Sequence, residues 1–210
     1  MASVDEGYFR HIVEHPELSR QDARLIRERL PDARRIVDVG CGRGGFVEIC
    51  RRELGAALGL DNEAAAAAIC RADGLPFVRG DAERLPFAGG ALDVVRAKEI
   101  VEHLPDPRPM LSEFLRSLRP GGLLLCHVPS QFSALYPIGN FWDDYTHVRP
   151  LSRLGLRRLL EDSGFGVEEI RGYTAGRNGV ERLLGRALAL ALPHTWLGLA
   201  RRPDAGATPI

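Results

Sequence analysis

The stretch from residue 35 to residue 45, R-I-V-D-V-G-C-G-R-G-G, constrains the fold of this 210-residue chain most strongly. Its first half is a short β-branched run, typical of a strand buried on both faces of a parallel sheet. Its second half is rich in glycine, which permits a sharp turn and lets a ligand approach the backbone. Apolar periodicity over 46–54 predicts a helix next. A helix N-terminus after a glycine turn offers free N–H groups, so we expect a ligand there.

The glycines alone leave two kinds of ligand open. Gly40, Gly42 and Gly45 also satisfy the G-x-G-x-x-G spacing of dinucleotide-binding enzymes, and Asp61 follows about 20 residues later, where such enzymes keep an acid for the ribose. Asp38, inside the strand, distinguishes the two. Its carboxylate would repel a pyrophosphate and attract an ammonium group, such as that of a methionine moiety. The sequence therefore favours a methionine-containing nucleoside over a nicotinamide dinucleotide.

Predicted strands and helices alternate along the whole chain, which indicates an α/β sheet. The length fits one domain spanning 1–210. Within it we expect an N-terminal helical lid over 1–34, whose alternative is a packing helix, and an amphipathic helix over 177–192. The strands are expected at 36–39, 56–60, 76–78, 91–95, 123–128, 167–173 and 195–200.

Several motifs in this order resemble those of class I S-adenosylmethionine (SAM) methyltransferases. They are the glycine stretch, G-D-A-E-R-L-P-F at 80–87, E-H-L-P-D-P at 102–107 and R-P-G-G at 119–122. The resemblance covers roughly residues 20–202. It implies a Rossmann-like, seven-stranded, mostly parallel sheet with helices on both faces and the last strand antiparallel. It also implies SAM as the cofactor and S-adenosylhomocysteine as its product.

The same resemblance implies a set of cofactor-binding residues. Asp61 would accept hydrogen bonds from both ribose hydroxyls, and Asp81 would accept one from the adenine amino group. The N–H of Ala82 would donate to a ring nitrogen. The full set is Asp38, Gly40, Cys41, Gly42, Asp61, Asn62, Asp81, Ala82, Glu83 and Ala97.

The resemblance extends to quinone-biosynthesis O-methyltransferases and to enzymes that methylate sugars or secondary metabolites. It implies a small-molecule, glycan or lipid acceptor, methylated on oxygen. Methylation of nitrogen or carbon, and a non-catalytic or NAD-type nucleotide-binding protein, are the alternatives. The 28 basic and 28 acidic residues balance, so no basic field for nucleic acid is expected.

A long connection over 129–150 is expected to form the acceptor pocket. It holds five of the chain's fourteen aromatic residues, Phe132, Tyr136, Phe141, Trp142 and Tyr145. Long loops in compact domains are usually functional or disordered, and aromatic residues argue against disorder.

Removing the proton of an acceptor hydroxyl requires a base that works near neutral pH, and histidine suits that task. His147 in the acceptor loop is our first candidate, with Asp144 or Asp143 orienting it. His103 is the second candidate. For each histidine a purely structural role is the alternative.

Glu99, Glu102 and His103 form an E-x-x-E-H cluster. Some quinone O-methyltransferases carry this cluster and resemble divalent-metal-assisted enzymes. Two carboxylates and an imidazole suit a hard or borderline cation. The same sequence occurs in relatives without metal, so no resident metal is expected here.

The remaining expectations concern location and assembly. The four cysteines lack C-x-x-C spacing, and the N-terminus lacks the apolar core of a signal peptide, which together indicate a cytoplasmic protein with reduced thiols. No apolar run is long enough to span a membrane. The apolar stripe over 180–192 would pack on the sheet, on a partner subunit or on a membrane surface, and the oligomeric state stays open.

Overall fold

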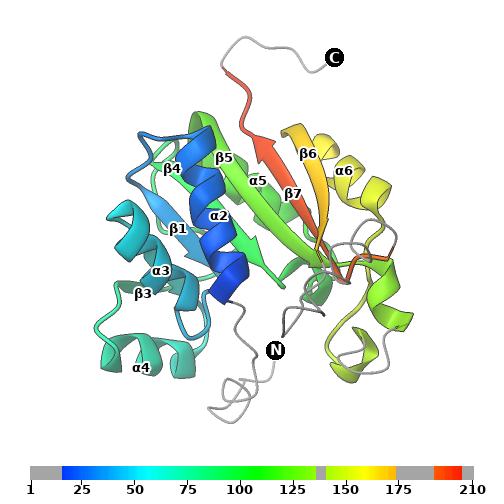
Figure 1. Cartoon of the computed structure of the whole chain (residues 1–210), viewed down its shortest axis with the longest axis horizontal. Helices are drawn as coiled ribbons and strands as arrows, with labels where there is room; N and C mark the ends of the chain where they lie inside the picture. Colours follow the sequence, from blue (N-terminus) through cyan, green and yellow to red (C-terminus); the bar gives the residue numbers. More distant parts are fainter. Residues whose placement is uncertain (1–15, 136–140, 174–191, 205–210) are drawn as a thin grey trace.

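The computed structural model describes residues 16–135, 141–173 and 192–204. Its centre is a seven-stranded sheet in the order β3-β2-β1-β4-β5-β7-β6 (Figure 1). Neighbouring strands pair in parallel except β7, which is antiparallel to both β5 and β6. The strands are β1 (Ile36–Val39), β2 (Leu58–Asp61), β3 (Phe77–Arg79), β4 (Leu92–Lys98), β5 (Leu118–Pro129), β6 (Gly166–Tyr173) and β7 (Thr195–Arg201). The expected mostly parallel sheet with an antiparallel last strand is confirmed.

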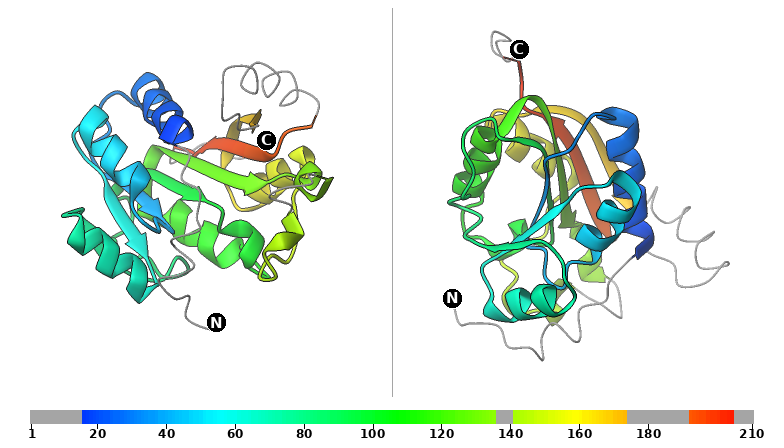
Figure 2. Two further views of the ribbon diagram at one scale, coloured as in Figure 1. Left: turned by 60° about the horizontal axis from the view of Figure 1, so that its bottom comes forward. Right: turned by 90° about the vertical axis from the view of Figure 1, so that its left-hand side faces the viewer.

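Helices cover both faces of the sheet (Figure 2). One face carries α2 (Pro16–Arg29) and α3 (Gly45–Leu54), and the other carries α5 (Arg108–Ser117) and α6 (Arg153–Asp162). Helix α4 (Ala64–Ala72) lies beside β3. Alternate side chains of each central strand enter opposite cores, as strand geometry requires. Val94 packs with α2 and α3, whereas its neighbour Val95 packs with α5 and α6.

Helix α2 is a packing helix over its described length. Its Leu25 and Ile26 are buried against the sheet and α3. The helix ends at Arg29, shortly before Pro31, which cannot supply the N–H that a helix interior needs. The packing alternative thus describes 16–29, while residues 1–15 of the expected lid lie outside the described residues.

The strand expected at 123–128 begins earlier in the structure, so that it includes the R-P-G-G sequence at 119–122. The preceding helix already ends at Ser117, and β5 begins at Leu118, so these four residues lie inside the strand. The pairing of β5 with β4 shifts register here, between Leu92 and Val94. Gly121 has a φ of 70°, which a residue with a side chain rarely adopts.

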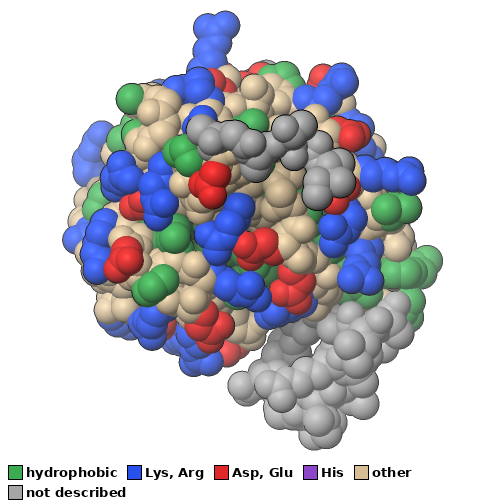
Figure 3. Space-filling view, turned by 90° about the horizontal axis from the view of Figure 1, so that it is seen from above, with side chains coloured by type: hydrophobic (Ala, Val, Ile, Leu, Met, Phe, Trp, Pro, Cys, Tyr) green, Lys and Arg blue, Asp and Glu red, His purple; other side chains and the backbone are tan. Residues whose placement is uncertain are grey.

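The two edges of the sheet differ in character. At the amino edge of the parallel strands, basic and acidic side chains lie side by side (Figure 3). The carboxyl edge carries the glycine turn and three short 3₁₀ helices, namely η1 (Val101–His103), η2 (Gln131–Leu135) and η3 (Phe141–Asp143). In open α/β sheets ligands bind at that carboxyl edge. No helix among the described residues is long and apolar enough to cross a membrane, and residues 177–191 of the expected amphipathic helix lie outside them.

Candidate functional site

The glycine turn after β1 is pressed against the segment that follows β4. Gly40 has a φ of 68°, and a Cβ there would lie 2.6 Å from Cδ1 of Ile100. Glycine suits this position, since any side chain would be strained at this φ and would require the Ile100 side chain to move. The N–H of Gly40 donates to the carbonyl of Leu60 at 2.7 Å, which joins the turn to the end of β2. Three strand ends therefore meet at this turn.

Asp61 lies directly against the glycine turn. Its two carboxylate oxygens accept the backbone N–H groups of Gly42 and Glu63, each at 3.0 Å. The side chain is buried, and burial raises the pKa of its carboxyl. Because a carboxylate occupies the N–H of the central glycine, the turn presents negative charge. That charge disfavours a pyrophosphate at this position, where a dinucleotide would place one.

Asp38 is 2% exposed and pairs with Arg96 of β4, whose Nη1 donates to its Oδ1 at 2.8 Å. Burial raises the pKa of the Asp38 carboxyl, although the guanidinium opposes that shift. The ring of Phe46 lies 4.4 Å from the Arg96 guanidinium carbon. The charge expected to face an ammonium group is thus already shared with a buried cation. Its role towards a cofactor stays a prediction.

Sequence reasoning missed the rest of this buried network. Nε of Arg96 donates to Asp22 of α2 at 2.7 Å, and Nε2 of His127 lies 3.0 Å from the same carboxylate. Although burial acts to raise it, the pKa of Asp22 is lowered, because His127 and Arg96 surround it. A signal was available, since Arg96 stands next to the apolar pair Val94 and Val95 in a buried strand, and a buried charge requires partners.

The other cofactor-site candidates occupy the same edge in different settings. Oδ1 of Asp81 accepts the N–H of Glu83 at 2.9 Å, which closes a tight turn. Asp81, Glu83 and Asn62 are exposed, and Ala82 is half-buried. Ala97 is buried inside β4 and packs in the core beneath α5, and its role towards a cofactor stays a prediction. Cys41 is buried in the turn, and a Cβ at Gly59 would lie 2.7 Å from its Sγ.

A second group of polar side chains gathers where η1 meets the loop over 129–150. One ligand-type atom from each of Glu102, His103 and His147 lies within 4.8 Å of the other two. The two imidazole centroids are 4.6 Å apart. Burial, and after it the neighbouring His147, lowers the pKa of His103. The structure thus brings the two candidate histidines together, although sequence reasoning treated them separately.

Hydrogen bonds settle the tautomers of both histidines. Nδ1 of His147 lies 2.7 Å from the carbonyl oxygen of Phe141, and a carbonyl only accepts, so this nitrogen carries the proton. The hydroxyl of Thr146 donates to Asp144 at 2.6 Å, and it therefore accepts from Nδ1 of His103 at 2.8 Å. In the neutral form of each ring, the lone pair is therefore on Nε2.

The Asp144–His147 pair differs from the expected arrangement. Oδ2 of Asp144 is 3.9 Å from Nε2 of His147, which is too long for a hydrogen bond. The carbonyl of Phe141 orients His147 instead, while Asp144 accepts from the hydroxyl and the N–H of Thr146. Asp144 therefore acts on the neighbouring imidazole, His103, through the threonine. Asp143 is exposed on η3.

The loop is fastened to η1 beside these side chains. The N–H of Val148 donates to the carbonyl of Glu102 at 2.8 Å, and the Arg149 guanidinium donates to the carbonyls of Leu104 and Pro105. Phe141 is 2% exposed, and its ring centroid lies 4.5 Å from that of His147. The loop thus holds His147 against η1 through backbone contacts, which limits its movement.

Comparison with known proteins decides between the two classes of ligand. A family model described as a methyltransferase domain matches residues 9–170. The chain belongs to this family. Within it the chain is a class I SAM-dependent member, and SAM is the cofactor of that class. The NAD-type alternative is thereby set aside.

Individual relatives agree with this assignment. The chain is 30% identical over 181 residues to a probable SAM-dependent methyltransferase of Mycolicibacterium smegmatis, covering 82% of this chain and 65% of the relative. It is 31% identical over 202 residues to a fatty-acid O-methyltransferase of the same species, covering 90% and 70%. A SAM-dependent methyltransferase from Archaeoglobus fulgidus has the same fold, with a TM-score of 0.71, 24% identity and coverage of 93% of this chain and 97% of that one. The chain thus spans slightly less than two thirds of the first relative.

Proposed function

We propose that the chain transfers the methyl group of SAM to an oxygen atom of an apolar, lipid-like acceptor. One observation carries the proposal. The contact between Gly40 and Ile100 places the glycine turn next to the segment that continues into Glu102 and His103. The proposed nucleoside site and the two histidines would therefore adjoin at the carboxyl edge of one sheet. Methyl transfer needs this arrangement, since the nucleophile must approach behind the methyl group.

Each end of the cofactor has a proposed partner along that edge. Asp61 would exchange its bonds to the glycine turn for bonds to the ribose hydroxyls, which are charge-assisted and therefore strong. The turn at Asp81 would receive the adenine. Asp38 would act at the methionine end together with Arg96, whose guanidinium leaves the pair without net charge. The ammonium group would then be recognised largely by the backbone of the turn, with the pair behind it.

The surroundings of the acceptor loop support an apolar acceptor. Trp142 is 59% and Tyr145 is 93% exposed, and Leu135 and Leu154 are also exposed. A cavity of about 390 Å³ beside the loop is lined by apolar side chains, among them Val101, Leu151 and Leu159, and by charged ones, namely Asp106, Arg108, Arg149, Arg158 and Asp162. That volume lies in the usual range for small-molecule sites. The fatty-acid O-methyltransferase relative acts on such a molecule.

An alcohol acceptor must lose a proton as its oxygen attacks the methyl group. The lone pair on Nε2 of His147 would take that proton, while the Phe141 carbonyl keeps the ring in the required tautomer. His103 is the second candidate base, and its Nε2 would take the proton. Asp144 orients the His103 ring through Thr146. A positioned base of this kind contributes roughly 10²–10⁴-fold.

The experiment uses calorimetry with S-adenosylhomocysteine, followed by a screen of long-chain acids, alcohols and amines with SAM. We expect tighter binding of S-adenosylhomocysteine than of NAD. Asp61→Ala should weaken that binding by about 1.5–3 kcal/mol, because the ribose loses charge-assisted hydrogen bonds. The matched control is Asp73→Ala, an exposed carboxylate at the end of α4, which should bind as the wild type does. Equal affinity of both variants would show that Asp61 does not hold the ribose. Turnover of amines alone would contradict the oxygen acceptor.

A further inference from the structure

Glu102 is an unusual side chain for a protein interior. It is 1% exposed, and neither carboxylate oxygen has a hydrogen-bond partner among the described residues. A buried carboxylate without partners costs free energy, and native structures retain such groups mainly where a ligand completes them. The two imidazole Nε2 atoms that adjoin it also have lone pairs without a donor. Three side chains that can each donate an electron pair thus lie together.

We propose that Glu102, His103 and His147 bind a divalent cation of borderline softness, of the Zn²⁺ type. Two imidazoles and one carboxylate are the protein ligands of one class of catalytic zinc site and of the facial triads that bind other first-row metals. Mg²⁺ fits poorly, because it prefers oxygen ligands. The set differs from the E-x-x-E-H cluster of the sequence, since His147 takes the place of Glu99.

The geometry beyond the three ligands supports this assignment. Metal-binding histidines almost always donate their other ring N–H to a carbonyl or a carboxylate-linked group, which fixes the tautomer. Here Nδ1 of His147 donates to the Phe141 carbonyl, and Nδ1 of His103 donates to Thr146, which in turn is held by Asp144. These bonds leave Nε2 of each ring as the nitrogen that can bind a cation. The ligand atoms, now within 4.8 Å of one another, would close to about 3–3.5 Å around a cation.

The backbone next to the site adds a further sign of function. Glu99 has a φ of 56°, and it is the sole non-glycine residue with positive φ among the described residues. Such conformations persist where the surrounding structure enforces them, and they cluster at functional sites. Glu99 stands at the junction of β4 and η1, and its N–H donates to the carbonyl of His127 at 3.1 Å. The strained residue therefore sets the direction in which η1 presents Glu102 and His103.

The cation site extends the proposed function, and its part in the reaction rests on that function. With three protein ligands, coordination positions stay open for an acceptor oxygen. A bound cation lowers the pKa of a coordinated hydroxyl, so the proton leaves to water before the oxygen attacks the methyl group. The two Nε2 lone pairs would then hold the cation, and the general-base step would be replaced. Binding of the cation itself does not depend on SAM or on an acceptor.

The test is a titration of the tag-free, chelator-treated protein with Co²⁺, followed by visible absorption, with Zn²⁺ and Mg²⁺ as competitors. We expect one equivalent to bind with d–d bands, Zn²⁺ to displace it, and Mg²⁺ to leave it in place. His147→Gln should weaken binding more than about 100-fold, since it removes a ligand, and Thr146→Val should weaken it about 10–100-fold through His103. His194→Gln is the matched control and should bind normally, because His194 lies outside the group.

Circular dichroism of each variant checks the fold, and Thr146→Val alters only a half-turn at the surface. Absence of saturable uptake would overturn the proposal, as would uptake that His147→Gln leaves unchanged, since the cation would then sit elsewhere. If no cation is taken up and methyl transfer proceeds in excess chelator, the cation site is contradicted and the proposed function is kept. If the cation is taken up but no methyl transfer is detected, the cation site is kept and the proposed function is contradicted.

Discussion

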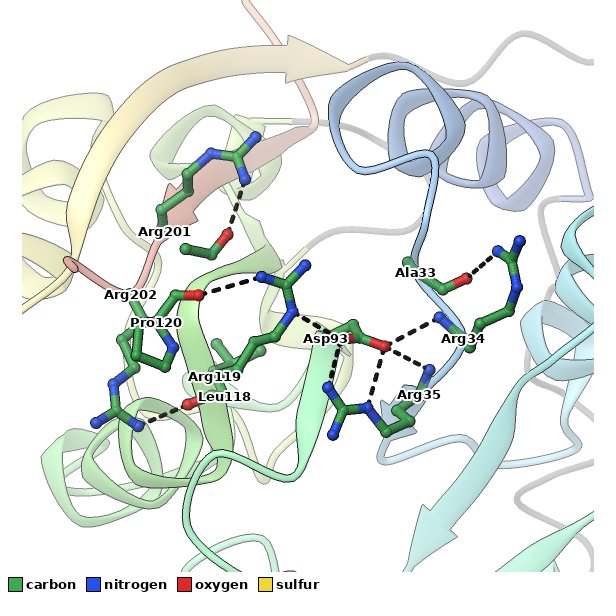
Figure 4. A network of polar contacts seen from close by, with 10 residues as sticks. Ala33, Arg34, Arg35, Asp93, Leu118, Arg119, Pro120, Arg201 and Arg202 are labelled. Atoms are coloured by element: carbon green, nitrogen blue, oxygen red, sulfur yellow. Dashed lines mark hydrogen bonds and ion pairs between the residues drawn. The ribbon is translucent and has the colours of Figure 1, made fainter. Parts of the chain in front are cut away.

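Two buried carboxylates near opposite ends of β4 have opposite surroundings. Asp93, at the amino end, is 4% exposed and accepts five hydrogen bonds from three arginines (Figure 4). Glu102, just beyond the carboxyl end, is 1% exposed and accepts none from the described residues. The buried carboxylate at the amino edge thus has hydrogen-bond donors, whereas the one at the carboxyl edge has none among the described residues.

The pKa values report the same contrast. Burial acts to raise the pKa of Asp93, but the hydrogen bonds from Arg35, from the backbone of Arg34 and from Arg119 outweigh it and hold that pKa below its usual range. For Glu102, burial and the neighbouring Glu99 raise the pKa well above the usual value. The donors thus make Asp93 a source of stability, whereas Glu102 is retained at a cost to stability. A residue kept at such a cost indicates function.

The largest expected effect comes from Asp93→Ala. It leaves the N–H groups of Arg34 and Arg35 without an acceptor, and we expect the free energy of unfolding to fall by about 2–4 kcal/mol, a range that discounts the solvent-exposed guanidinium groups. Because the folded pKa is lowered, the contribution of Asp93 is present above its unfolded pKa and is lost as the pH falls below about 4. Urea unfolding at pH 7 measures the loss of stability, and the same measurement at pH 3.5 tests its dependence on pH. Glu48→Gln, which removes an exposed pair with Arg52, should change stability by less than about 0.5 kcal/mol.

Glu102→Met should have the opposite sign and a smaller size. In the presence of chelator, replacing an unpartnered buried carboxyl by an apolar side chain of similar volume should raise the free energy of unfolding by about 1–2 kcal/mol. Urea unfolding measures it. The matched control is Glu113→Met, which removes a carboxylate that accepts from Leu85 and Arg116 and should lower stability by about 1 kcal/mol. A loss of stability in both variants would mean that Glu102 has a partner and would weaken the contrast between the edges.

The smallest effect on stability is expected for Trp142→Ser combined with Tyr145→Ser. Both side chains are exposed at the carboxyl edge, so unfolding should shift by no more than about 0.5 kcal/mol. The double variant should nevertheless lose cosedimentation with vesicles that carry a long-chain fatty acid, since exposed aromatic residues favour such interfaces. Unchanged cosedimentation would separate these residues from the acceptor.

How well a feature could be predicted depended on how far apart its residues lie in the sequence. The hydrogen bond from Gly42 to Asp61 was not foreseen, but the strand–turn–helix order at 36–54 and the place of Asp61 at the end of the second strand were. They depend on periodicity and on the rule that carboxyl ends of parallel strands meet at one edge. The Asp144–His147 contact was foreseen from proximity in sequence, and it failed as a hydrogen bond because a backbone carbonyl already occupies Nδ1.

The amino-acid sequence by itself determined the family, the alternation of strands and helices, and the edge of the sheet at which a ligand is expected. Only the tertiary structure decided which polar side chains face one another across that edge. It paired Asp38 with Arg96, and it placed His147 rather than Glu99 beside Glu102 and His103. The reason is physical. Local backbone preferences and apolar periodicity are written into neighbouring residues, whereas the partner of a buried polar group depends on how distant elements pack and on which donors that packing leaves within reach.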